Sequence, residues 1–348
     1  MAYTTIDNPE LYFQVKTYTG NGSTQSITLD GSEDMAPDLV WMKQRNAAQS
    51  HVLIDSVRGV LKRLRSDQSD AEDTKADSLT AFGTDGFTLG SAYEVNYASW
   101  NWKANGSGSA NTDGSISSTV SANAVSGFSI VKWSGSGSNA TIGHGLGVAP
   151  KMVITKSLGS SAWGVYNENL GNTNILFLDT SAATSAHIAY WNNTSPTSSV
   201  FTVGSDDAVN HSGNNMIAYC FAEKQGYSKF GSYIGQNPAG SSNKQFIYTG
   251  FKPSFVMIKE SSGNGHWVMY DNKRENTFNP TTGRLVADDN GSENINSDAI
   301  NLLSNGFYIT DTSNDLRTIN ANNETYTFMS FAEAPFVTGS GGVPCNAR

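Results

Sequence analysis

Short apolar runs separated by turn-forming residues dominate the hydrophobic pattern of this chain. The runs span about 4–8 residues and are rich in Val, Ile, Phe, Tyr, Trp and Thr, with clusters of Gly, Asn, Asp and Ser between them. Helical periodicity is nearly absent, because its best candidate, residues 56–64, has Gly59 in its middle. Trp100 and Trp102 flank Asn101, an alternation that places both indoles on one side of a strand. The pattern predicts an all-β protein built from antiparallel β-sandwich, or jelly-roll-like, units.

A proline that opens an apolar strand ending in lysine occurs three times. An aromatic-x-Gly element precedes each copy, and a strand ending in Asp or Asn follows it. The proline-to-lysine strands are residues 37–43, 150–156 and 253–259, the preceding elements are 18–20, 133–135 and 233–235, and the following strands end at Asp55, Asn167 and Asp271. The shared order predicts three tandem copies of one unit of about 100 residues. Because the lysines recur in every copy, a strand-capping role is favoured over catalysis.

The landmarks and the composition between them divide the chain into five segments. We expect β-sandwich repeats at residues 1–105, 126–225 and 226–337, a polar linker at 106–125 and a flexible tail at 338–348. The linker and tail predictions rest on stretches rich in Gly, Ser and Asn, which are typical of flexible connections and chain ends.

Composition and charge argue against several classes of protein. The net charge of −9 and a charged fraction of only 15% argue against a nucleic-acid binder, which would normally present a basic face. No run approaches about 18 apolar residues, so no transmembrane helix is expected, and no signal peptide is visible at the start of the chain. Of the two cysteines, Cys220 lies in an apolar run and Cys345 in a Gly-rich stretch. Two free thiols are favoured over a disulfide, which fits synthesis in a reducing cytoplasm.

Catalytic and metal-binding patterns are weak. The five histidines do not occur at metal-ligand spacings. The glycine-rich segment around His144 is followed by a proline and a strand instead of a helix, so a turn is predicted and not a phosphate loop. The carboxylate pairs Asp206-Asp207 and Asp288-Asp289 do not recur among the copies, which favours solvated loops over a glycosidase pair. The second pair, with Gly291 and Glu293, also lacks EF-hand spacing. We therefore expect no catalytic residue, no metal site and no cofactor.

Aromatic residues give the remaining functional signal. Core packing is expected for those at equivalent strand positions, namely Trp163, Tyr166, Trp267 and Tyr270. The segment Tyr190, Trp191, Asn192 and Asn193 precedes a polar loop and has no clear counterpart in the other copies. We predict that this segment is exposed and forms a contact site for a glycan or receptor, with rings that stack on sugars and amides that hydrogen-bond to them.

Several motifs together resemble a repeat module of virion proteins from tailed bacteriophages, marine ones in particular. The similarity extends from about Phe13 to Val337. Its motifs are residues 18–22, 37–43, 55–59, 78–82, 85–90, 143–151, 250–253, 269–274 and 331–337. The resemblance implies a tail-fibre or other appendage protein with lectin-like β-sandwich units that takes part in host attachment.

The resemblance also implies partners and a location. These are other virion proteins, a host surface glycan or receptor, and copies of the same chain, with a homotrimer expected by family analogy, and neither nucleic-acid binding nor membrane insertion. The chain would be made in the host cytoplasm and reside in the virion. Because the first repeat begins directly after residues 1–11, without the usual anchoring domain and shaft, a capsid decoration or other virion adaptor protein is an alternative. A polysaccharide depolymerase, suggested by the loops around Tyr190 and Asp206, and a cellular lectin-like module are further alternatives.

Overall fold

Antiparallel β-sheets make up almost all of the regular structure, which confirms the all-β prediction. The computed structural model describes residues 3–238, 242–274, 279–281, 283–295, 299–310 and 318–338. Its helical elements are short: η1 (Pro9–Leu11), η2 (Glu168–Leu170), α1 (Ile188–Trp191) and α2 (Asp207–Asn210). Within the described ranges, no helix is long and apolar enough to cross a membrane.

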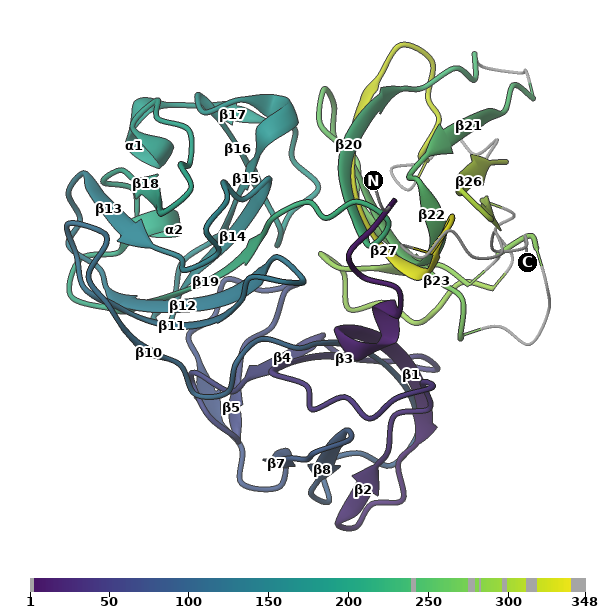
Figure 1. Ribbon diagram of the computed structural model, residues 1–348, viewed down its shortest axis with the longest axis horizontal. Helices are drawn as coiled ribbons and strands as arrows, with labels where there is room; N and C mark the ends of the chain where they lie inside the picture. The colour runs from purple at the N-terminus through teal and green to yellow at the C-terminus, as the bar shows by residue number, and fades with distance from the viewer. Residues whose placement is uncertain are drawn as a thin grey trace.

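Three main sheets share one strand order, in which a closing strand lies between the first strand and the proline-headed strand. The first sheet has the order β1 (Phe13–Thr19), β9 (Asn96–Trp102), β3 (Leu39–Gln44) and β4 (Val52–Asp55). The second contains β12 (Phe128–Ser134), β19 (Asn215–Phe221), β14 (Met152–Ser157) and β15 (Trp163–Asn167). The third contains β20 (Ser228–Ile234), β27 (Thr325–Pro335), β22 (Phe251–Glu260) and β23 (Trp267–Asp271). We call the segments β1–β9, β10–β19 and β20–β27 the first, second and third unit, and Figure 1 shows them as three lobes around a common centre.

A smaller sheet covers the outer face of each main sheet. In the first unit it is β2 (Gln25–Ile27), β8 (Phe87–Leu89) and β7 (Leu79–Phe82), in the second β13 (Ala140–Gly143) and β18 (Val200–Val203), and in the third β21 (Gln245–Tyr248), β26 (Gly306–Ile309) and β25 (Ile300–Leu303). Each pair of sheets encloses its own apolar cluster, so each unit has the two packed layers of a β-sandwich. The remaining strands are β5 (Lys62–Arg63), β6 (Asp73–Thr74), β10 (Ser109–Asn111), β11 (Ser118–Asn123), β16 (Asn174–Phe177), β17 (Ser185–Ala186) and β24 (Leu285–Val286).

The inner faces of the three main sheets share a single core. One apolar cluster contains residues of all three units, from Phe13 in β1 to Phe331 in β27. The indole of Trp102, in the first unit, lies 6.2 Å from the ring of Phe221 in the second and 5.6 Å from that of Phe331 in the third. The three sandwich-like units therefore share one inner core, because the inner face of each main sheet is apolar and is covered by the neighbouring units.

The aromatic-x-Gly elements mark a close approach of two backbone segments. A Cβ atom at Gly20, Gly135 or Gly235 would lie 2.4, 2.2 or 2.0 Å from a backbone carbonyl oxygen of the segment before the closing strand. Only glycine fits so close to another chain segment, which explains the recurrence of this motif.

The units are joined in a closed ring by equivalent contacts. The residue that begins or directly precedes the fourth strand of each main sheet donates from its side-chain ring to a backbone carbonyl of another unit. Trp163 of the second unit donates to Arg65 O of the first (2.8 Å), and Trp267 of the third donates to Phe177 O of the second (2.8 Å). His51 Nε2 of the first lies 2.8 Å from Val286 O of the third and closes the ring.

Backbone hydrogen bonds repeat this cyclic arrangement. Glu72 N of the first unit donates to Leu158 O of the second (3.0 Å), Thr184 N of the second to Ser261 O of the third (3.1 Å), and Glu293 N of the third to Arg45 O of the first (2.8 Å). Each acceptor lies two residues after a strand-end lysine. The three junctions thus share one geometry, as in a ring of head-to-tail subunits.

The structure differs from the expectation at residues 106–125 and does not describe most of residues 338–348. Residues 106–125, expected to be a polar linker, contain β10 and β11, which extend the second main sheet next to β12. Backbone hydrogen bonds hold these strands, and this is why a composition poor in apolar residues did not reveal them. The expected tail, residues 338–348, lies outside the described residues apart from Thr338.

Candidate functional site

The strand-end lysines are buried structural groups. Lys43, Lys156 and Lys259 have no exposed surface. Each Nζ donates to backbone carbonyl oxygens of the turn that follows: Lys43 to Gln44 and Ala47, Lys156 to Ser157 and Gly159, and Lys259 to Glu260. Lys259 also reaches Ala182 O of the second unit at 2.9 Å. Burial lowers the pKa of each of these amines from 10.5 to about 8, with acidic side chains nearby opposing the shift.

Two buried acid–arginine pairs also lie at the junctions between units. Arg58 Nε lies 2.5 Å from Asp55, and the hydroxyl of Tyr219 in the second unit donates to the same carboxylate (2.8 Å). In the third unit Arg274 Nε lies 2.5 Å from Asp271, which accepts from the indole of Trp100 in the first unit (3.0 Å). Because each carboxylate is held by an arginine and an aromatic donor, these groups serve the junctions between units.

The second unit replaces this acid–arginine pair with an amide. Asn167 occupies the position of the two aspartates at the end of β15, and its Nδ2 donates to Thr327 Oγ1 of the third unit at 2.7 Å. Its Oδ1 accepts from Asn169 N and starts η2, so the amide both links two units and caps a turn. The recurring position therefore keeps its place in the ring although its chemistry changes.

The predicted contact segment 190–193 is only partly exposed. Trp191 is 2% exposed, its indole donates to Asn174 O (3.0 Å), and its ring lies edge-on to Tyr166. The expectation that Trp191 is exposed is therefore wrong, because α1 turns this ring into the core of the second unit. Tyr190 and Asn192 are half-buried and Asn193 is exposed. Asn192, with φ 49°, ends α1 in the left-handed conformation, so its position serves the turn. A role of these residues in glycan or receptor contact stays a prediction.

The expectation of solvated acidic loops fails at residues 288–293. The Asp288 carboxylate is 1% exposed and accepts from Trp267 N at 2.9 Å. Glu293 is 4% exposed and pairs with Arg274 (2.6 Å) and Arg45 (2.7 Å). The Glu293 carboxylate joins the third unit to the first through Arg45, whereas Asp288 holds the start of β23 within the third unit. The described residues contain no group of three or more His, Cys, Asp or Glu side chains that could hold a metal ion.

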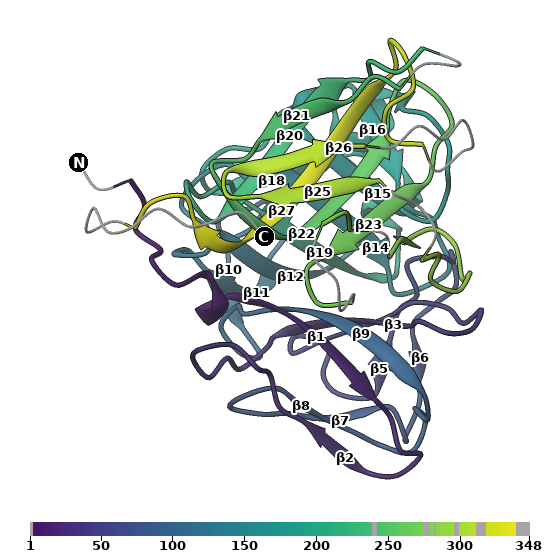
Figure 2. The same ribbon diagram turned by 90° about the vertical axis from the view of Figure 1, so that its right-hand side faces the viewer.

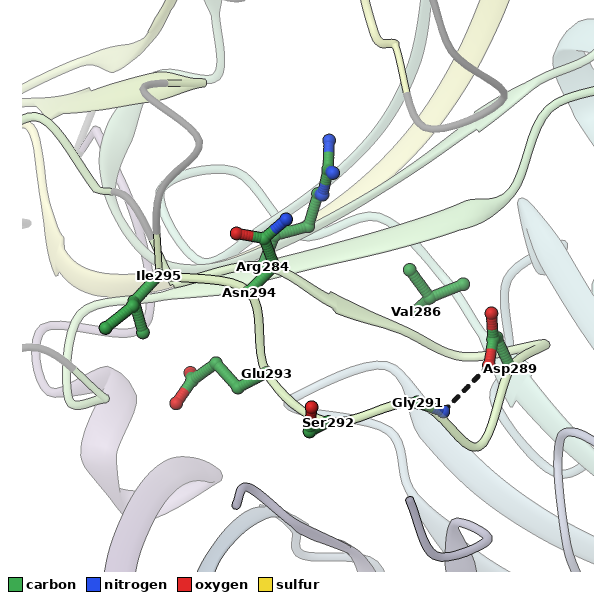
Figure 3. Close-up of a pocket in the computed structure, with 8 residues that line it drawn as sticks. All are labelled: Arg284, Val286, Asp289, Gly291, Ser292, Glu293, Asn294 and Ile295. Atoms are coloured by element: carbon green, nitrogen blue, oxygen red, sulfur yellow. Dashed lines mark hydrogen bonds between the residues drawn. The ribbon is translucent and has the colours of Figure 1, made fainter. Parts of the chain in front are cut away.

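A cavity of about 480 Å³ lies beside this loop (Figure 3). It is lined by Arg284, Val286, Asp289, Gly291, Ser292, Glu293, Asn294 and Ile295. Asp289 Oδ1 accepts from Gly291 N (2.7 Å) and stabilises the turn, as the dashed line in Figure 3 shows. Figure 3 shows the Glu293 carboxylate directed away from Asp289, so the two acids do not form a pair across the cavity. The arrangement does not resemble the paired carboxylates of a glycosidase.

The other motifs considered in the sequence also have structural roles. Asp206 caps α2 by accepting from Ala208 N at 2.9 Å. His144 is buried in a turn, accepts from Leu146 N (3.2 Å) and lies 3.2 Å from Thr197 O, as the turn prediction requires. Cys220 is a buried free thiol. Burial in an apolar core raises the pKa of this thiol above its ordinary value, so the reactive thiolate is disfavoured.

Residues 8–335 match the sequence profile of a family described as "Domain of unknown function (DUF7483)". The chain belongs to this family. No curated protein and no solved structure matched the chain. The family match spans all three units, which agrees with their common core.

The contacts between units were not predicted from the sequence. His51 was considered only as a possible metal ligand, yet it closes the ring on Val286 O. One signal could have revealed this role, because His51 lies eight residues after Lys43 and Trp267 lies eight residues after Lys259. The equivalence of His51 and Trp267 is not visible in the sequence, because the two residue types differ and share only a ring N–H that can donate a hydrogen bond.

Proposed function

We propose that this protein is a structural component of a bacteriophage virion, most simply a tail appendage that takes part in host attachment. The closed ring of three units is the observation that carries the proposal. Its core, its buried ion pairs and its strand-end lysines all serve cohesion, and Asp206, Asp288 and Asp289, from the carboxylate pairs considered for catalysis, each accept from a nearby backbone N–H. The virion assignment itself rests on the resemblance of the repeat motifs to phage virion proteins.

The ring suits a rigid scaffold that displays its surface. Three equivalent junctions bury the inner faces of the main sheets, so the outer sheets and their connecting loops face outward (Figures 1 and 2). Loops on such a scaffold can vary without disturbing the core, which is the usual arrangement for recognition surfaces. A rigid frame that displays loops at its surface suits a role in host attachment.

The internal threefold arrangement bears on the expected homotrimer. A single chain already provides three similar surfaces related in a ring, so it can meet a threefold partner without forming a trimer of its own. The same geometry fits a threefold position of a capsid shell, and capsid decoration is the second candidate function.

Immunogold labelling and quantitative mass spectrometry of purified virions test the proposal. We expect the chain in intact particles, with label at the tail and one copy for each threefold position. Label over the head would favour capsid decoration. Absence of the chain from purified particles would overturn both forms of the proposal. Release of reducing ends from host capsule by the pure protein would instead support the depolymerase alternative.

A further inference from the structure

Because the three units share one fold, equivalent positions of their small sheets can be compared. One such position differs in the third unit. The central pair on the face of the small sheet opposite the core is Ser26 with Thr88 in the first unit and Thr141 with Thr202, itself only 7% exposed, in the second. In the third unit the equivalent pair is Phe246 with Tyr308. The first two units form this sheet with small polar pairs, so the fold does not require aromatic rings here.

The third unit also exposes these rings to an unusual degree. Among the described residues, Phe246 (43% exposed) and Tyr248 (55% exposed) are the exposed large aromatic side chains. They alternate along β21 with Gln245 and Ile247, which are buried. A Cβ atom at Gly306 would lie 2.9 Å from the Phe246 ring, which therefore lies across β26 near the half-buried Tyr308. The small sheet that carries these residues faces the viewer in Figure 2.

A cleft adjoins this aromatic face. Its volume is about 270 Å³, and Tyr248 and Tyr3 form part of its wall together with Gln225, Ser228 and Lys229. The hydroxyl of Tyr3 donates to Gly250 O, which ties the N-terminal segment to the end of β21. Lys229 pairs with Glu223 at 2.9 Å, so the cleft carries little net charge. The third unit thus combines an aromatic platform with a small polar recess.

We propose that the face formed by Phe246, Tyr248 and Tyr308 binds a carbohydrate, so that it is the glycan contact of the attachment function proposed above. The face of an aromatic ring carries partial negative charge, which attracts the partially positive C–H groups of a pyranose. Asn301 lies opposite Tyr308 on β25, and the hydroxyls of Tyr248 and Tyr308 add polar groups at the rim. Neutral polar groups around a ring surface are the chemistry that sugars require.

The size of the face favours a sugar over a second protein. An aromatic side chain presents about 150–250 Å² when fully exposed, so the two exposed rings offer roughly 200 Å². A stable protein interface needs about 800 Å² on each partner. One or two sugar rings match the smaller area, and several such weak contacts reach useful strength when a virion presents many copies.

A glycan-binding experiment tests the inference with a variant that carries, in the third unit, the residues found at the equivalent positions of the first unit. Phe246→Ser combined with Tyr308→Thr places the residues of the first unit into the third. The probe is a printed array of bacterial capsule and lipopolysaccharide oligosaccharides, followed by calorimetry with the oligosaccharide that binds best. We expect the unaltered protein to bind and the double variant to lose at least about tenfold in affinity. Ser26→Ala combined with Thr88→Ala is the matched control and should bind as the unaltered protein does.

The outcomes separate this inference from the virion assignment. The melting temperature of each variant shows whether it has folded, and both should remain near that of the unaltered protein because all four positions lie on the face of the small sheets opposite the core. Equal binding by the folded double variant, absence of binding by the unaltered protein to every glycan, or cross-linking of another virion protein to this face would overturn the inference. Absence of the chain from purified virions would overturn the proposed function and leave the glycan result standing.

Discussion

The indole Nε1 of Trp163 lies 2.8 Å from the carbonyl oxygen of Arg65, a residue 98 positions earlier in the sequence. This hydrogen bond joins the second unit to the first, and its equivalents join the third unit to the second and the first to the third. Because the last contact connects Val286 with His51, the ring closes only after most of the chain has been made. Stability and folding should therefore belong to the whole chain.

The first prediction concerns the shared core. Trp102→Ala should lower the free energy of unfolding of the entire chain by about 3–5 kcal/mol, because this buried indole packs against rings of all three units. Urea denaturation followed by fluorescence and by far-ultraviolet circular dichroism should show one coincident transition. The surface control Tyr248→Ala should change stability by less than about 0.5 kcal/mol. Separate transitions with only one affected would mean that the units unfold independently.

A second prediction concerns an isolated unit. Residues 226–337 alone would expose the inner face of β22 and β27, which the other two units normally cover. We expect this fragment to be unfolded or to self-associate, as seen by analytical ultracentrifugation and nuclear magnetic resonance. A monomeric, well-dispersed fragment as stable as the full chain would contradict the shared core.

The third prediction concerns His51. The indole of Trp41 can only donate, so His51 Nδ1 accepts it at 2.9 Å and the proton resides on Nε2, which donates to Val286 O. Burial lowers the pKa of His51 to about 3. Nitrogen-15 nuclear magnetic resonance should therefore show a neutral, Nε2-protonated ring down to about pH 4. A protonation midpoint near the ordinary value of 6.5 would refute this arrangement.

Replacing His51 tests the same contact energetically. His51→Phe leaves the buried indole N–H of Trp41 without a partner and removes one of the two hydrogen bonds accepted by Val286 O, which should cost about 1–3 kcal/mol of unfolding free energy. Val125→Phe is the control, because Val125 is 52% exposed. An equal effect of the two substitutions would show that the His51 contacts contribute little.

The fourth prediction is a pH dependence set by the three strand-end lysines. Their pKa in the folded chain is about 8, below the 10.5 of an unfolded lysine. Between about pH 8 and 10 the unfolded chain therefore holds more protons, so stability rises with pH, by up to about 1.4 kcal/mol per pH unit for each lysine. Burial also raises the pKa of the Cys220 thiol, which opposes this rise above about pH 9, and raises the pKa of Tyr219 and Tyr227 well above 10, which reverses the trend at higher pH.

Urea denaturation from pH 7.5 to 10 measures this slope. Lys156→Met should reduce the slope by about a third, whereas Lys244→Met, at an exposed position, should leave it unchanged. Stability that stays flat or falls across this window in the unaltered protein would contradict the assignment.

The sequence predicted the positions of the strands well, but it did not predict which parts of the chain pack against them. The proline-to-lysine runs correspond to strands β3, β14 and β22, because apolar runs bounded by turn residues are a local signal. The run Leu39-Val40-Trp41-Met42 is apolar on both faces, which indicates two covering layers but not which part of the chain supplies each. The second layer comes from another unit, and that information is distributed over contacts about 100–250 residues apart, such as the 235 that separate His51 and Val286.

The candidate site was predicted least well, for reasons that concern single residues. Trp191 was expected at the surface because Asn192 and Asn193 follow it, but a single helical turn is enough to bury the ring and expose its neighbours. Phe246 and Tyr248 were not singled out, because an aromatic residue in a strand is most often in the core. Only the strand register, which places Phe246 at the position of Ser26, shows that they face outward.

Covalent linkage of the three units gives each one a freedom that identical subunits lack. In an assembly of three separate copies, a change in one gene would alter every subunit together, at the junctions and on the surface alike. Here the position held by an acid–arginine pair in two units has become the amide of Asn167 in the other, while the ring stays closed. One unit can therefore change its residues independently while the other two units preserve the closed ring.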